Sequence, residues 1–144
     1  MLKEELQNIG VETQILENEK EKTTIIQNWR KHFCSNYYSQ SKKKRRRYSS
    51  CDFDIMDEGL YGNEAIQSYQ NKQLYPIGFF IRHQSHFDHE ELVYCSGTLP
   101  DYEVLRSTLA GSDIYIIPER MKWTFVFTHE GDYVGDPFFV ELKS

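Results

Sequence analysis

Short apolar segments with strand periodicity recur through the last two-thirds of the sequence, and they set narrow limits on its fold. Segments of this kind cover residues 48–55, 74–82, 92–95, 113–117, 122–129 and 138–142. In the segment 122–129, Trp123, Phe125 and Phe127 alternate with Thr and Val, so the three aromatic side chains share one face and are expected in the core. Strands this short, separated by Gly, Pro and polar residues, predict a largely antiparallel sheet of about five strands.

Helix-like patterns lie before and between these strands. They cover residues 1–9, a segment from 23 or 24 to about 34, and residues 63–70 and 100–109. The last of these has Pro100 in its first turn, and Gly111 is placed to end it. Such an order predicts an α+β fold in which the helices pack on one face of the sheet.

Composition indicates one domain spanning residues 1–144. The chain is 39% hydrophobic and 15% aromatic, which is enough for a core and excludes a disordered protein. No apolar run approaches the roughly 18 residues of a membrane span. The three cysteines, Cys34, Cys51 and Cys95, form no CxxC pair and are expected as free thiols. We therefore expect a cytoplasmic protein with no membrane partner.

Charge is distributed unevenly along the chain. Residues 1–47 carry a net charge of +5, whereas residues 48–144 carry −10. Six of the basic residues form one run, 42–47, which must be a solvated loop because its charges repel one another. The run lacks interleaved aromatic residues and the whole chain has a net charge of −5, so we do not expect a nucleic-acid partner.

A group of histidines and acidic residues at 83–91 suggests a metal site as an alternative. His83, His86, Asp88 and His89 are residue types that bind zinc, with His129 as a further candidate. The piece from Ser85 to His89 resembles part of the HxHxDH motif of the metallo-β-lactamase fold, but Gln84 stands where the first histidine should be. The alternative function is therefore a small metal-dependent hydrolase.

The C-terminal quarter resembles a family of small uncharacterised bacterial proteins, the "domain of unknown function" family 4275. The resemblance rests on the strand from Asp113 to Ile117, on Trp123-Thr124 and Thr128-His129-Glu130 in the next strand, and on Gly135 with Pro137 near the end. Here Asp136 interrupts Gly and Pro, and Phe138-Phe139 replace Tyr-Phe. The resemblance implies a small bacterial cytosolic protein without an assigned activity, of the type to which immunity proteins belong.

The acidic second part of the chain supports the leading hypothesis, a non-catalytic inhibitor of the immunity or antitoxin type without a cofactor. A negative field steers a basic partner, such as a nuclease toxin, and aromatic residues supply anchors. The expected partner-binding residues are acids and one tyrosine: Asp52, Asp54, Asp57, Glu58, Tyr61, Asp88, Glu90 and Glu91. No catalytic residue is assigned, because the sequence contains no GxSxG, P-loop or GxGxxG motif.

Overall fold

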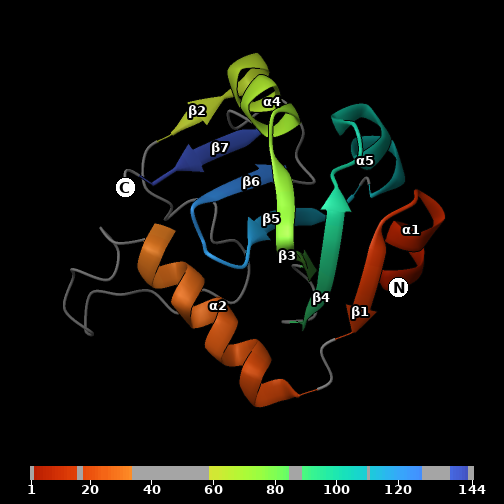
Figure 1. The fold of residues 1–144 in the computed structure, drawn as a ribbon, viewed down its shortest axis with the longest axis vertical. Coiled ribbons are helices and arrows are strands. Elements are labelled where there is room, and N and C mark those ends of the chain that lie inside the picture. The colour runs from red at the N-terminus through yellow and green to blue at the C-terminus, as the bar shows by residue number, and fades with distance from the viewer. Residues whose placement is uncertain are drawn as a thin grey trace.

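The computed structural model describes residues 2–15, 18–33, 59–84, 89–109, 111–127 and 137–142 (Figure 1). Within these ranges the chain forms four helices and seven strands. In chain order they are α1 (Leu2–Asn8), β1 (Glu12–Ile15), α2 (Glu19–Phe33), β2 (Leu60–Tyr61), α4 (Gly62–Gln70), β3 (Gln73–Gln84), β4 (His89–Thr98), α5 (Tyr102–Thr108), β5 (Asp113–Pro118), β6 (Trp123–Phe127) and β7 (Phe138–Glu141).

All seven strands join one sheet in the order β1-β4-β3-β5-β6-β7-β2, and every neighbouring pair is antiparallel. The predicted α+β class with an antiparallel sheet is therefore confirmed. Seven strands replace the expected five or so, because both edge strands, β1 and β2, escaped prediction. The strand predicted over 48–55 lies outside the described residues.

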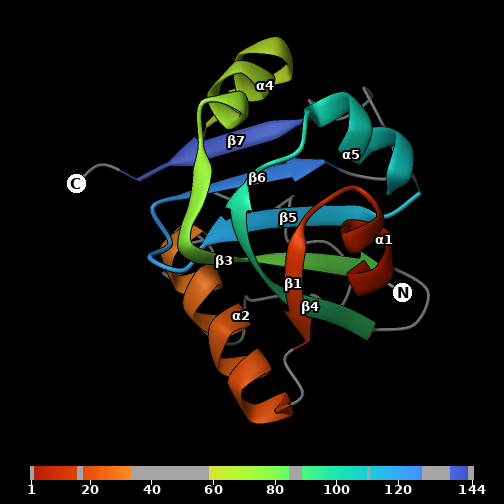
Figure 2. The ribbon, with the colours of Figure 1, turned by 45° about the vertical axis from the view of Figure 1, so that its right-hand side comes forward.

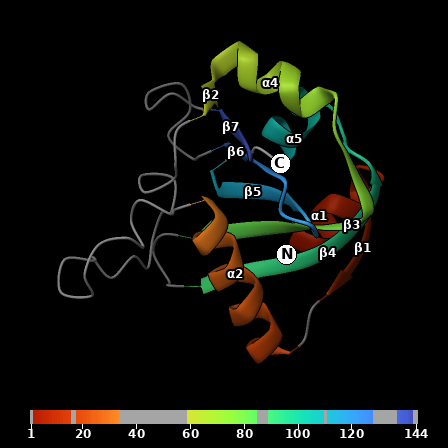
Figure 3. The same ribbon diagram turned by 60° about the vertical axis from the view of Figure 1, so that its left-hand side comes forward.

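The sheet is covered on both faces, which corrects the expected packing of all helices on one face (Figures 2 and 3). Side chains of β3 alternate between two apolar clusters: Phe80 lies in one, and Phe79 and Ile81 lie in the other. The first cluster contains residues of α1, α4 and α5, and the second contains residues of α2. We call these sides the three-helix face and the α2 face. Trp123, Phe125 and Phe127 lie together in the first cluster, as predicted.

Helix α2 begins at Glu19, earlier than the periodicity predicts, because Asn18 caps it. The Asn18 side-chain oxygen accepts hydrogen bonds from the backbone amides of Lys20 and Glu21, at 2.9 and 3.2 Å. Near the other end, the buried Trp29 indole donates to the hydroxyl of Thr124 at 2.8 Å and meets the Tyr115 ring edge-on. Among the described helices, none has the length and apolar character that crossing a membrane requires.

Strand β2 sits tightly against β7, and two glycines make this possible. A Cβ atom at Gly59 would lie 2.3 Å from the carbonyl oxygen of Phe139, so no other residue fits there without a backbone shift. Gly62 has a φ of +61° and donates its amide hydrogen to the Pro137 carbonyl at 2.9 Å. These contacts fix Leu60 and Tyr61 at the end of the sheet, where helix α4 begins.

Candidate functional site

Three of the predicted partner-binding residues belong to described strands, and these strands lie far apart in the sheet. Tyr61 lies on β2, whereas Glu90 and Glu91 lie on β4, and four strands separate β2 from β4. At about 4.8 Å per strand, this places the two groups on the order of 24 Å apart. Asp52, Asp54, Asp57, Glu58 and Asp88, like the basic run 42–47, lie outside the described residues. Among the described members of the predicted set, Tyr61 is therefore distant from Glu90 and Glu91.

The β2 end of the sheet exposes apolar side chains that a core would normally hide. Leu60 is 39% exposed and Tyr61 is 52% exposed, and Val104 on α5 is the third large hydrophobic residue in the described chain with such exposure. Leu60 pairs with Phe139 and Tyr61 with Phe138, so the two side chains flank opposite sides of the sheet edge. The Tyr61 ring rests on the Phe138 ring at a centroid distance of 4.8 Å. Tyr61 is therefore exposed yet supported from behind, as interface anchors are.

Carboxylates accompany this apolar pair. Glu64 is exposed in the first turn of α4, three residues after Tyr61. In the sequence, the four acids from Asp52 to Glu58 precede Leu60 within eight residues. We call Leu60, Tyr61 and Glu64 the β2 edge.

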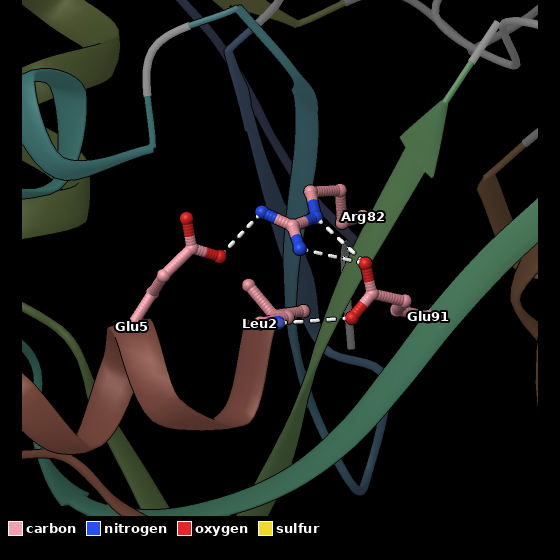
Figure 4. Close-up of polar contacts among 4 residues, drawn as sticks. All are labelled: Leu2, Glu5, Arg82 and Glu91. Carbon is pink, nitrogen blue, oxygen red and sulfur yellow. Dashed lines mark hydrogen bonds and ion pairs between the residues drawn. The ribbon is translucent and has the colours of Figure 1, made fainter. Parts of the chain in front are cut away.

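Glu91, in contrast, has partners within the protein (Figure 4). One of its carboxylate oxygens accepts from Arg82 on the neighbouring strand at 3.0 and 2.6 Å, and the other accepts from the Leu2 backbone amide at 2.9 Å. Arg82 also pairs with Glu5 on α1. Arg82 and Glu91 side chains are only 8% and 17% exposed. This cluster of Arg82, Glu91, Glu5 and the α1 amide ties α1 to the sheet.

The cluster shifts the titration of both strand residues. Burial opposes the charged form of Glu91, but the hydrogen bonds from Leu2 and Arg82, together with the positive charge nearby, lower its pKa below the ordinary value. Burial likewise opposes a charged Arg82, and its bonds to Glu91 and Glu5 outweigh this and raise its pKa. Both groups stay charged and paired near neutral pH, so Glu91 offers little surface to a partner.

Of the residues proposed as metal ligands, the structure describes the backbone of His83 in β3 and of His89 in β4. His86 and Asp88 fall outside the described residues, as does His129. The register pairs position 83 with 90 and position 84 with 89. In the part of the chain that the structure describes, no group of three potential ligands could hold a metal ion.

Two buried groups that could carry chemistry are held in unreactive states. Burial raises the pKa of the Cys95 thiol to about 12, so the nucleophilic thiolate is scarce at neutral pH. Burial also raises the pKa of Tyr69, and its hydroxyl donates to the Pro100 carbonyl at 2.6 Å. These side chains serve the core.

The comparisons with known proteins add no relative. The chain matches no protein-family model, no curated protein and no solved structure. The resemblance of the C-terminal quarter to the uncharacterised bacterial family therefore stays an expectation, and the functional argument rests on the chain's own residues.

Proposed function

We propose that this protein is a non-catalytic binding protein that docks a basic protein partner at the β2 edge. The partner we infer is a bacterial toxin, which the protein neutralises as an immunity protein does. The observation that carries the proposal is the exposed Tyr61 ring, supported by Phe138 at the end of the sheet and preceded in sequence by four carboxylates.

Two physical effects support this choice of surface. Tyrosine is enriched among the anchors of protein interfaces, because it buries a large rigid ring and still offers a hydroxyl. Carboxylates around such an anchor accelerate encounter with a basic partner and discriminate against acidic ones. Glu64 supplies such a charge at the β2 edge, and four further acids precede Leu60 in the sequence, whereas Glu91 is not part of the surface.

The test begins by finding what touches Tyr61. A photo-crosslinking amino acid at position 61, introduced in the native cells, should capture a basic protein, whereas the same probe at Val104, the matched exposed site on α5, should not. The captured protein is then purified and its toxic activity assayed with and without this chain.

Affinity measurements decide between a docking site and an incidental contact. Tyr61→Ala should weaken binding of the purified partner about 30-fold, which corresponds to an anchor of about 2 kcal/mol, and Val104→Ala should leave it unchanged. Binding of the unaltered protein should weaken steeply with added salt. Equal effects of the two substitutions, or affinity independent of salt, would contradict the proposal.

A further inference from the structure

A pocket lies at the other end of the sheet, away from the β2 edge. It has a volume of about 720 Å³ and opens between the end of α1, the edge strand β1 and the neighbouring strands β4 and β3. Its lining includes Gln7, Val11, Glu12, Gln14, Ile77 and Tyr94. A volume of this size holds a small organic molecule.

The described residues that line the pocket have a definite chemical bias. Among them are one carboxylate, from Glu12, and no Lys, Arg or His. This described lining therefore offers no cation to a phosphate or carboxylate ligand. The amides of Gln7 and Gln14 and the outer backbone edge of β1, which no strand of the described sheet covers, provide hydrogen-bond acceptors. Val11 and Ile77 add an aliphatic surface.

The surroundings of Tyr94 indicate a negative electrostatic potential in this part of the pocket. Gln14 lies directly opposite it in the β1–β4 ladder, and its ring packs against Phe79 at a centroid distance of 5.2 Å. Burial raises the pKa of the Tyr94 hydroxyl, and the negative charges of Glu21 on α2 and Glu119 after β5 raise it further. A hydroxyl with a raised pKa remains neutral, and the surrounding potential favours a positive ligand.

We propose that this pocket binds a small organic cation, an alkylammonium or alkylguanidinium compound. The charged group lies between the Glu12 carboxylate and the Tyr94 ring, where an ion pair and a cation–π contact both favour it. The carbon chain lies against Val11 and Ile77. Burial raises the pKa of the Cys95 thiol, which is also in the lining, to about 12, so this group stays protonated and uncharged beside the ligand.

Three four-carbon probes test the charge preference directly: 1,4-diaminobutane, 1,4-butanediol and succinate, titrated into the full chain and followed by backbone amide NMR shifts. We expect saturable shifts at Glu12, Gln14 and Tyr94 with the diamine. The diol should bind about tenfold more weakly, because it lacks the charge-assisted contact, and succinate should not bind. Absence of saturable binding by the diamine, or equal binding by succinate or the diol, overturns the proposal.

Matched substitutions separate a built site from general charge attraction. Glu12→Gln keeps the side-chain shape and should weaken diamine binding about tenfold, whereas Glu103→Gln, an exposed acid on α5, should leave it unchanged. Tyr94→Phe should retain most of the affinity, and Tyr94→Leu should lose more of it, because only Leu removes the ring. Equal losses for Glu12→Gln and Glu103→Gln would show attraction by the net charge alone and reject the pocket.

Discussion

The two faces of the sheet are covered in different ways. Three short helices share the three-helix face, and α1, one of the three, is tied to the sheet by the Arg82 ion cluster. Of the helices that the structure describes, α2 covers the other face, and its Trp29 makes a buried hydrogen bond that joins this helix to β6. The first face thus spreads its attachment over several elements, whereas the second depends on one.

The two faces also differ in the kind of polar group that is buried beneath their helices. On the three-helix face, the structure tolerates a buried charge because Arg82 donates three hydrogen bonds to two carboxylates, those of Glu91 and Glu5. On the α2 face, the buried polar contact is between two neutral groups, the Trp29 indole and the Thr124 hydroxyl. Tyr94 and Ile25 at the margin of α2 are only partly buried, and Tyr94 also lines the pocket. Within the described chain, the margin of the α2 face is therefore less completely buried than its centre.

The largest expected effect tests the dependence on one helix. Trp29→Ala should lower the free energy of unfolding by about 4 kcal/mol, because it removes a large buried ring and its hydrogen bond. Thr124→Val keeps the ring and leaves only the indole NH without its acceptor, so it should cost about 2 kcal/mol. Urea denaturation of both variants gives these values. A loss for Trp29→Ala no greater than that for Thr124→Val would mean that α2 is held elsewhere.

A smaller effect tests the ion cluster on the three-helix face. Arg82→Met should cost about 3 kcal/mol, since the half-buried carboxylates of Glu91 and Glu5 lose their cation. Introducing Glu91→Met into the Arg82→Met variant should cost less stability than Glu91→Met alone costs in the unaltered protein. In the Arg82→Met background the substitution removes a carboxylate that has already lost its cation. A double-variant cycle from urea denaturation measures this coupling. Additive losses for the two substitutions would show that Arg82 and Glu91 do not stabilise one another.

The smallest expected effect is a pH dependence of stability that arises from Glu91, in the ion cluster on the three-helix face. The pKa of Glu91 is lower in the folded chain than when unfolded, so its contribution is fully present above the ordinary glutamate pKa of about 4.3. That contribution is lost as pH falls through the lower folded value. Thermal unfolding between pH 6 and pH 3 should therefore show a flatter decline for Glu91→Gln than for the unaltered protein. Glu103→Gln should follow the unaltered protein, and parallel curves for all three would refute the assignment.

Strands and helices were predicted correctly from the sequence where a segment's own apolar pattern identifies it. Strands β5 and β6 are buried along their full length, and their Ile, Tyr, Phe and Val residues predict strands. Helix α5 was also predicted, because Pro100 and Gly111 bracket its apolar positions. For these elements, local pattern and final environment agree.

The edge strands and the charged clusters could not be found in the same way. Strand β1 is mostly polar, and β2 has two residues, too few for any periodicity. The start of α2 did carry a signal, since Asn18 followed by Glu21 is the pattern of a helix cap. The Arg82–Glu91 pair depends on the β3–β4 register, which extends further toward the hairpin end than the apolar residues do. Pairing between strands, which the periodicity of a single segment does not reveal, decides the edge strands and the Arg82–Glu91 pair.

The strand order also has a consequence for the sequence of events in folding. Strand β1 has one neighbour in the sheet, β4, which ends at Thr98, and β2 has one neighbour, β7, which ends at Glu141. As a ribosome extends the chain, both segments emerge long before the strands that receive them. The β3–β4 hairpin closes a much shorter loop and can nucleate early. We expect the two outermost strands to join last and the amino-terminal segment to wait as a free arm during translation.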